Sequence, residues 1–251
     1  MDTRVKQQTS QQAGLPVVTI SVFRFDPNEE QAPHFDDFEV SVRPGQTVLE
    51  ALFDILDMQD GSLAFRYSCR GAVCGSCAMY INGAYRLACE TQVMALNARR
   101  VTVNPLPHLP VIRDLVVDMA PFFEKYEQIK PYLLTDSVPQ EKEKLQSPKQ
   151  RRAINEAIDC ILCAACYAAC PMVWTDKGYL GPAALTKAYR FVADSRDEAR
   201  SSRLRLVANE DGVWRCHTIM NCVEACPKKI NQTDAIQHLK RGSVLRKLKF
   251  W

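Results

Sequence analysis

Eleven cysteines determine the chemistry that this chain of 251 residues can perform, and most of them fall into short, regularly spaced runs. The first run has the spacing C-x4-C-x2-C with a fourth cysteine further on, which is typical of a plant-type 2Fe-2S site. Small residues such as Gly71 and Ala72 fill the loop, so its backbone N–H groups can approach the cluster sulfurs. We predict that the four thiolates for the two irons are those of Cys69, Cys74, Cys77 and Cys89. Unligated structural cysteines and a zinc site are the alternatives.

The second run has the spacing C-x2-C-x2-C-x3-C-P, which is typical of bacterial ferredoxins. Its cysteines are Cys160, Cys163, Cys166 and Cys170, followed by Pro171. In two-cluster ferredoxins the first three bind one cluster, while the fourth ligates the other. A partner run is therefore expected downstream, and Cys216, Cys222 and Cys226 provide it before Pro227.

The downstream run lacks one ligand, because the spacing requires a cysteine at position 219 and the sequence has Ile219. Exchange of the fourth ligands then divides seven thiolates into a set of four and a set of three. The set of four predicts a 4Fe-4S cluster on Cys160, Cys163, Cys166 and Cys226, and the set of three predicts a 3Fe-4S cluster on Cys170, Cys216 and Cys222. Isoleucine cannot coordinate a metal, and we expect its side chain to pack in the core and shield the vacant corner.

Zinc is the rival ligand for these cysteines. Structural zinc sites are closed sets of four N/S ligands, typically in two separated pairs, whereas the runs here hold four, four and three cysteines in an exchanged order. His217 could complete a zinc set, but it lies beside Cys216 rather than at the vacant position. A dithiol redox enzyme is favoured less, because most of the cysteines belong to longer ligand runs.

Motifs for other chemistry are absent from the sequence. It contains no G-x-G-x-x-G, no G-x-x-x-x-G-K-[ST], no H-E-x-x-H and no G-x-S-x-G. Three clusters without a flavin, nucleotide or hydrolytic site indicate an electron carrier between two partners, with no substrate-oxidising site of its own.

The charge distribution restricts the partners. The net charge of +3 at pH 7 is too small to favour nucleic acid. Against Asp234 alone, the last 27 residues hold seven basic residues, namely Lys228, Lys229, Lys240, Arg241, Arg246, Lys247 and Lys249. These residues form either a solvated basic face or a surface attracted to anionic lipid headgroups or an acidic partner.

Neither a membrane span nor a targeting signal is expected. The chain has no run of 18 apolar residues, so we do not expect it to span a membrane. Residues 1–15 are polar and lack the apolar segment of a signal peptide. They predict a flexible N-terminal extension in a reducing compartment.

The elements that must position the first run form a small sheet with one helix. Alternating apolar residues predict strands at 17–25 and 38–42, and the capping-box spacing of Thr47 and Glu50 begins a helix. Asn82-Gly83 predicts a type I′ hairpin between strands at 78–81 and 84–88, and another strand is expected at 101–103. These elements account for residues 16–104.

Beyond this sheet the apolar period becomes helical. Three prolines within residues 104–110 predict a stiff connector. Helices are expected over 114–130 with a break at Pro121, and over 152–159, 182–193 and 234–240, with an exposed loop at 135–150. We therefore expect a linker with a connecting helix over 105–150 and a helical domain over 151–251.

Four segments in this order resemble the iron–sulfur subunit of the succinate dehydrogenase/fumarate reductase family: NPLPHLPVIRDLVVDM at 104–119, CILCAACYAACP at 160–171, GPAAL at 181–185 and CHTIMNCVEACPK at 216–228. The resemblance implies an α+β fold, in which a β-grasp plant-type 2Fe-2S ferredoxin domain precedes an α-helical, bacterial-ferredoxin-like domain. It implies electron transfer from a covalent FAD in a separate flavoprotein through the 2Fe-2S, 4Fe-4S and 3Fe-4S clusters. The electrons then reach a quinone at a membrane anchor, which can include a cytochrome b.

The resemblance also implies a quinone pocket beside the 3Fe-4S cluster, with Pro171, His217 and Ile219 at the matching positions. The family often has tryptophan where this chain has Thr175, and Trp174 stands one place earlier. Quinone contact and simple packing therefore both stay open for Trp174. A peripheral subunit on the cytoplasmic face of a prokaryotic membrane is implied. A fumarate reductase working in the reverse direction and a soluble subunit of a thiol- or heterodisulfide-linked reductase are the alternatives.

Overall fold

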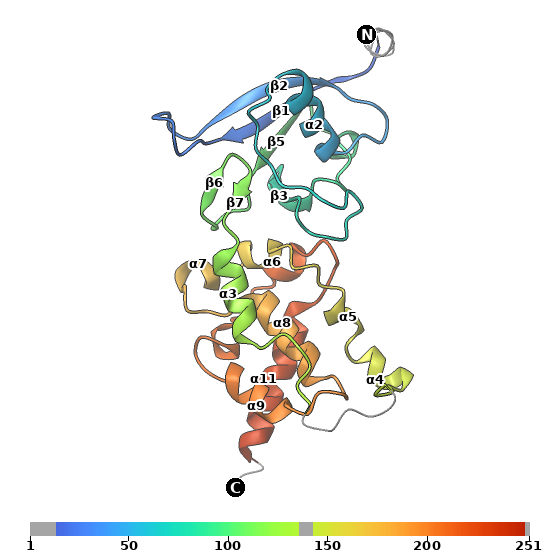
Figure 1. The fold of residues 1–251 in the computed structure, drawn as a ribbon, viewed down its shortest axis with the longest axis vertical. Helices are drawn as coiled ribbons and strands as arrows, with labels where there is room; N and C mark the ends of the chain where they lie inside the picture. Colours follow the sequence, from blue (N-terminus) through green and yellow to red (C-terminus); the bar gives the residue numbers. More distant parts are fainter. Residues whose placement is uncertain (1–13, 136–142, 249–251) are drawn as a thin grey trace. The chain divides into compact units, whose positions relative to one another are not determined.

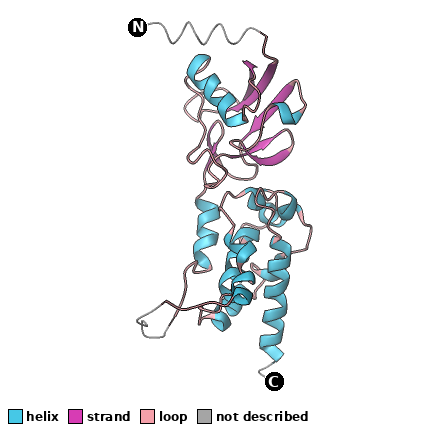
Figure 2. Cartoon of the chain, turned by 90° about the vertical axis from the view of Figure 1, so that its right-hand side faces the viewer, coloured by secondary structure: helices cyan, strands magenta, loops and turns pink. Residues whose placement is uncertain are grey.

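A computed structural model describes residues 14–135 and 143–248. The chain divides into two compact units, Met1–Val117 and Asp118–Trp251 (Figure 1). Strands gather in the first unit and helices dominate the second (Figure 2), which confirms the predicted α+β class. The predicted extension at residues 1–15 lies almost wholly outside the described residues.

The first unit is built on a mixed five-stranded sheet with the order β2-β1-β5-β3-β4. Its strands are β1 (Val17–Arg24), β2 (His34–Ser41), β3 (Ala78–Ile81), β4 (Ala84–Leu87) and β5 (Arg100–Asn104). Strands β1 and β5 are parallel, and the other neighbouring strands are antiparallel. Alternate residues of β1 and β5, such as Ile20, Val22, Val101 and Val103, are completely buried. This is the sheet that the alternating pattern predicts.

One helix, α2 (Val48–Met58), contributes the rest of this core. Thr47 caps it: its hydroxyl accepts from the N–H of Glu50, whose carboxylate accepts from the N–H of Thr47. The predicted capping box is therefore confirmed. The buried side chains of the helix are Val48, Leu49, Ala51, Leu52 and Ile55.

Strand β2 begins four residues before the predicted strand at 38–42. It pairs with β1 over its whole length, from Val17 opposite Ser41 to Arg24 opposite His34. Because β2 is an edge strand and mostly exposed or half-buried, its sequence does not show a regular apolar alternation. The bounds of β2 therefore follow from its pairing with β1 and not from its own apolar pattern.

The segment after the proline-rich connector differs most from expectation. Strands β6 (Val111–Arg113) and β7 (Val116–Val117) form a small hairpin, and a helix, α3, begins only at Ala120 and ends at Gln128. The predicted helix over 114–130 is therefore wrong in its first part. Pro121 does not break this helix but occupies its first turn, where no N–H donor is needed.

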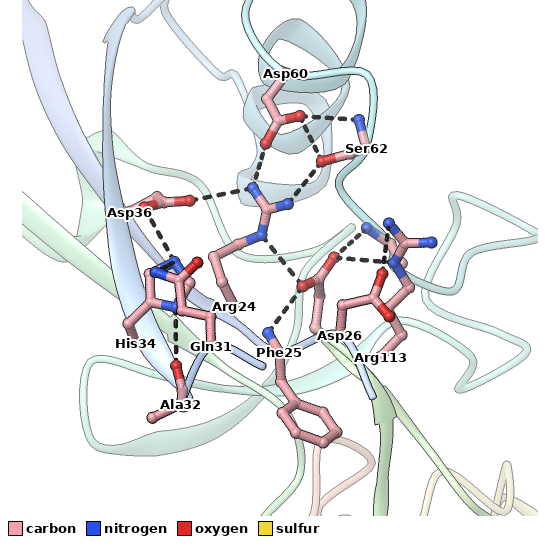
Figure 3. Close-up of polar contacts among 12 residues, drawn as sticks. Arg24, Phe25, Asp26, Gln31, Ala32, His34, Asp36, Asp60, Ser62 and Arg113 are labelled. Carbon is pink, nitrogen blue, oxygen red and sulfur yellow. Dashed lines mark hydrogen bonds and ion pairs between the residues drawn. The ribbon is translucent and has the colours of Figure 1, made fainter. Parts of the chain in front are cut away.

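A buried carboxylate explains the hairpin. Asp114 lies at the turn with a positive φ of 44° and is only 2% exposed. It accepts hydrogen bonds from the N–H groups of Phe25 and Ala64 and from Nε of Arg24. Arg24 also contacts Asp60, Asp36 and Ser62 (Figure 3). These hydrogen bonds stabilise residue 114 in a turn with positive φ, a backbone conformation that is incompatible with an α-helix.

The described part of the second unit is helical. Its elements are α3, α4 (Pro148–Arg152), α5 (Asn155–Ile158), α6 (Ala165–Ala168), α7 (Pro171–Thr175), α8 (Gly181–Val192), α9 (Arg200–Val207), a 3₁₀ turn η2 (Val213–Arg215), α10 (Asn221–Glu224) and α11 (Gln232–Leu248). Helix α8 is almost completely buried and contacts α3, α5, α6, α9 and α11. It confirms the helix predicted over 182–193 to within one residue at each end.

Two other helices differ from their predicted bounds. The helix expected over 152–159 is divided into α4 and α5, and α4 begins within the predicted loop at Pro148, after a capping box between Ser147 and Gln150. Helix α11 continues well beyond the predicted end at residue 240. An added Cβ at Gly242 would lie 3.2 Å from Leu204, so this glycine allows α9 and α11 to approach each other closely.

The unit boundary follows Val117, so residues 105–117 belong to the first unit and residues 118–150 to the second. The region predicted as a linker, 105–150, is thus shared between the two units. In the described residues, no helix combines the length and apolarity required to cross a bilayer.

Candidate metal centres

The hairpin of β3 and β4 brings two cysteines of the first run together. Asn82 and Gly83 both have positive φ, 46° and 76°, as a type I′ turn requires. At the open end of this hairpin, the N–H of Ala88 donates to the carbonyl of Cys77 across 3.0 Å. Cys77 and Cys89 therefore flank the end of the same two-stranded ribbon.

The loop before the hairpin brings the other two cysteines to the same place. The N–H groups of Gly71, Val73 and Cys74 donate to Sγ of Cys69 over 3.3–3.4 Å. Across the loop, the N–H of Ala72 donates to Sγ of Cys89 over 3.3 Å. Positive φ at Arg70, Ala72 and Gly75 turns these amides inward. The structure thus gathers all four predicted thiols, with amide donors directed at their sulfurs.

These surroundings affect the four thiols differently. Hydrogen bonds from the amides of Gly71, Val73 and Cys74 lower the pKa of Cys69 to about 6, because they stabilise the thiolate. Burial raises the pKa of Cys77 to about 12. One side of the site is therefore exposed and rich in donors, while the other is buried in the sheet.

Arg70 connects this loop to α2 through a cation–π contact. Its guanidinium lies 4.6 Å from the centre of the Phe53 ring and 5.5 Å from that of Tyr67. Phe53 and Tyr67 also pack edge to face at 4.6 Å. Cation–π contacts of this kind contribute about 0.5–1 kcal/mol at exposed sites.

The second and third runs have the same backbone conformation. Leu162 and Ala164 have φ of 55° and 63°, and at the matching positions Thr218 and Met220 have 62° and 71°. Each run then enters a four-residue helix, α6 or α10. Cys163 stands between the two left-handed residues in the first case, and Ile219 stands between them in the second. The isoleucine therefore occupies the backbone position of a ligand.

One cavity of the second unit is bordered by four cysteines: Cys160, Cys163, Cys166 and Cys226. This is the predicted set of four, in which the last cysteine comes from the other run. Burial raises the pKa of Cys163 to about 12 and that of Cys166 well above its ordinary value, and the neighbouring thiols add to both shifts. The N–H of Ile230 donates to Sγ of Cys226 over 3.4 Å.

A second cavity is bordered by Cys170, Cys216 and Cys222, the predicted set of three. Burial raises the pKa of Cys222 to about 11, a nearby hydroxyl of Thr233 opposes this shift, and the Cys170 and Cys216 thiols reinforce it. Pro171, His217 and Ile219 line the same cavity. The structure therefore brings three of the four residues expected around a quinone pocket to the cavity of three cysteines.

Two expectations about individual side chains need correction. Ile219 is 49% exposed, so the prediction that it packs in the core is wrong. The reason is that residues 217–220 form an exposed loop that ends at α10. Trp174 does not line the cavity, and its indole N–H donates to the carbonyl of Ala168 over 2.8 Å.

Sequence reasoning missed several residues of the three-cysteine cavity, including Tyr179, Met220, Thr233 and Ile236. Tyr179 lies just before α8, and Thr233 and Ile236 lie on α11. None of these three residues belongs to a cysteine run. No local spacing connects them to the ligands. Only the structure shows that Tyr179 is buried, at 1% exposure.

The residues present fit iron–sulfur clusters. Soft thiolate ligands favour such clusters, and amides or hydroxyls approach sulfurs at all three sites. Within the described ranges, no three His, Cys, Asp or Glu side chains are close enough to enclose a single metal ion. In the second unit, the cysteines border the two cavities described above.

Comparison with domain families agrees with this order of sites. The 2Fe-2S iron-sulfur cluster binding domain family matches residues 19–124, and the 4Fe-4S dicluster domain family matches residues 152–227.

Comparison with individual proteins covers most of the chain. A succinate dehydrogenase iron-sulfur subunit from Coxiella burnetii is 44% identical over 227 residues, which are 89% of this chain and 95% of that protein. A chain of the Mycobacterium smegmatis Sdh1 complex in the apo form aligns with a TM-score of 0.85 at 28% identity, covering 94% of this chain and 98% of that one. A hypothetical protein from Helicobacter pylori aligns with a TM-score of 0.56 at 17% identity, covering 90% of this chain and 39% of that one. At this identity, the likeness concerns the fold alone.

Proposed function

The chain belongs to the family of succinate dehydrogenase iron–sulfur subunits, and we propose that it connects a flavoprotein to a membrane quinone through three clusters in a defined assignment. Electron transfer within an oxidoreductase complex is the function that its family and its two cluster domains give it. The proposal concerns the residues that hold each cluster, the terminal acceptor and the partners.

One observation carries the assignment. Ile219 occupies the backbone position in the third run that Cys163 occupies in the second, and the cavities join Cys226 to the second run and Cys170 to the third. We therefore assign a 4Fe-4S cluster to the set of four and a 3Fe-4S cluster to the set of three. The 2Fe-2S cluster is assigned to Cys69, Cys74, Cys77 and Cys89.

The clusters, when bound, supply one-electron transfer between a flavin and a quinone. The chain provides the thiolates, excludes water from the buried ligands and directs N–H groups at the sulfurs. The raised pKa values of Cys77, Cys163 and Cys222 mean that cluster insertion must displace protons from these thiols.

The three-cysteine cavity is where we place contact with the quinone. It is open to solvent, and exposed apolar side chains lie at its mouth, with Ile219 49% and Met220 46% exposed. His217 is exposed and provides a hydrogen-bond donor in the same loop. An apolar, partly open site with one polar group suits a quinone ring, whose oxygen accepts a hydrogen bond.

We propose that two kinds of partner complete the complex: a flavoprotein with covalent FAD, which oxidises succinate, and a membrane anchor, which can contain a cytochrome b. The relative from Mycobacterium smegmatis belongs to an Sdh complex, which supports this arrangement. The subunit would then be peripheral, on the cytoplasmic face of a prokaryotic membrane.

The cluster content of the complex tests the assignment. The complex is purified in air, and EPR spectra are recorded before and after reduction. We expect a three-iron signal in the oxidised protein, and signals of the 2Fe-2S and 4Fe-4S clusters after reduction. Absence of the three-iron signal would contradict the division into sets of four and three. Reduction of quinone by succinate in the same preparation tests the acceptor, and activity with artificial dyes alone would argue against it.

A further inference from the structure

The walls of the two cavities in the second unit differ in one kind of group. No residue lining the four-cysteine cavity carries a hydroxyl, whereas Tyr179, Thr218 and Thr233 line the three-cysteine cavity. Thr218 is exposed, and its hydroxyl accepts from Nε2 of Gln237 over 3.1 Å. Tyr179 and Thr233 are 1% and 4% exposed. Two buried hydroxyls therefore face the set of three cysteines.

Each buried hydroxyl has a different cysteine as its partner. Oγ1 of Thr233 lies 3.8 Å from Sγ of Cys222, in a contact that is completely buried. The phenol of Tyr179 lies beside Cys216, and both residues line the same cavity. Thr233 comes from the first turn of α11 and Tyr179 from the segment before α8, so the two groups are held by independent elements.

We propose that Tyr179 and Thr233 are positioning residues that raise the reduction potential of the cluster on Cys170, Cys216 and Cys222, by donating hydrogen bonds to two of its ligand sulfurs. This inference rests on the proposed function, because it requires a cluster on these three cysteines.

The direction of the two hydrogen bonds follows from ligand chemistry. A metal-bound cysteine is a thiolate and has no proton to donate, so each hydroxyl must be the donor. Tyrosine phenols and threonine hydroxyls both carry a proton at neutral pH, so each group can donate it.

The effect on potential follows from charge. Reduction adds an electron to a group whose ligand sulfurs are already negative, and a donor stabilises the reduced form more than the oxidised form. Hydrogen bonds to sulfur are among the factors that set cluster potentials. Of the two cavities in the second unit, only the three-cysteine cavity is lined by hydroxyl donors, and these favour reduction of the cluster beside the proposed acceptor.

The test is a redox titration of the purified complex, followed by EPR of the three-iron signal. Tyr179→Phe and Thr233→Val remove each hydroxyl with little change in volume. At a fixed ambient potential, we expect each variant to shift the ratio of reduced to oxidised cluster about tenfold toward the oxidised form. The double variant is expected to shift it further. Because a purely structural role would not move the potential of a cluster that still assembles, this readout separates the two roles.

Matched controls lie in the same unit. Thr186→Val removes a buried hydroxyl that donates to the carbonyl of Pro182 over 2.8 Å. Tyr189→Phe removes a hydroxyl whose contact with the carbonyl of Ala153 is exposed. Neither residue lines a cysteine cavity, so both controls should keep the wild-type potential.

Two further results would decide the inference. In D2O, wild-type protein should show an exchangeable deuteron coupled to the three-iron centre, and this coupling should weaken in each variant. Intact signals with unchanged potentials in Thr233→Val and Tyr179→Phe would overturn the inference while leaving the proposed function in place. Absence of the three-iron signal from the wild type would instead reject the cluster assignment itself. If Tyr179→Phe does not fold, Thr233→Val decides the question alone.

Discussion

Nε of Arg24 donates to Oδ1 of Asp114 over 3.1 Å, although the two residues are 90 positions apart. The guanidinium also contacts Asp60, Asp36 and Ser62 (Figure 3). Through Asp114, the contact continues to the N–H of Ala64, five residues before the first cysteine of the 2Fe-2S loop. This relationship joins the end of β1, the approach to the loop and the hairpin of β6 and β7.

Asp114→Ala should therefore destabilise the first unit strongly. Removal of this carboxylate takes away one of the three acidic partners of the partly buried Arg24 guanidinium and leaves two N–H groups without an acceptor. We expect a loss of about 3–5 kcal/mol in the free energy of unfolding. The measurement is thermal or urea unfolding of the purified complex, followed by the visible absorbance of the 2Fe-2S cluster.

Asp36→Asn is the matched control. Asp36 contacts the same guanidinium at 3.3 Å, but its side chain is 43% exposed. Exposed ion pairs contribute about 0–1 kcal/mol, so this variant should unfold nearly as the wild type does. Equal losses in the two variants would show that burial of Asp114 is not the source of its effect.

Arg203→Ala should destabilise the second unit. Arg203 is 2% exposed, pairs with Asp197, and donates to the carbonyls of Ile129, Lys130 and Tyr132. Its loss leaves a buried carboxylate and buried carbonyls without donors, at an expected cost of about 3–5 kcal/mol. Arg205→Ala, on the exposed face of the same helix, should stay within about 0.5 kcal/mol of the wild type. Unfolding of both variants by denaturant provides the comparison.

Cys89→Ala should abolish the 2Fe-2S cluster and spare the other two. Cys89 stands at the open end of the β3–β4 hairpin, and its sulfur accepts from the N–H of Ala72. We expect the 2Fe-2S signal to disappear from EPR spectra of the reduced protein, while the three-iron signal of the oxidised protein remains. Ser76→Ala changes the same loop without removing a ligand and should keep both signals. A full 2Fe-2S signal in Cys89→Ala would contradict the assignment.

Ile219→Cys should allow a 4Fe-4S cluster to form where three cysteines now stand. The backbone at residues 218–220 matches that around Cys163, so a thiol at this position points to the place of the missing ligand. We expect the oxidised three-iron signal to decrease and quinone reduction to slow. Because Ile219 is 49% exposed, little packing energy is lost. An undiminished three-iron signal, with Ile219→Val as the control, would show that position 219 is not the vacant ligand site.

His217→Ala should impair quinone reduction selectively. His217 lines the three-cysteine cavity and is proposed to donate to a quinone oxygen. We expect the rate with quinone to fall at least about tenfold, while reduction of an artificial flavin-level acceptor by succinate keeps its rate. His238→Ala, on α11 beside Asp234 and Tyr189, should affect neither assay. Similar losses in both assays for His217→Ala would assign a structural role to the histidine.

The sequence by itself determined the ligand runs, since the reach of a short loop around a cluster permits few spacings. The same spacing predicts the exchange of Cys170 and Cys226, and the isoleucine at position 219 predicts a set of only three thiolates. Local signals also predicted α2, the Asn82-Gly83 turn and α8, because a capping box, a left-handed pair of residues and a buried apolar face each act over a few residues.

Only the tertiary structure decided the features that depend on distant partners. Asp114 interrupts a helical pattern because Arg24, Phe25 and Ala64 satisfy its carboxylate. The open loop at residues 217–220 leaves Ile219 exposed, against the expectation of core packing. Tyr179 and Thr233 reach their cysteines from other elements, so no spacing along the chain could identify them. A buried polar group is stable only when it has a hydrogen-bond partner. Partners from separate segments come together only in the folded structure.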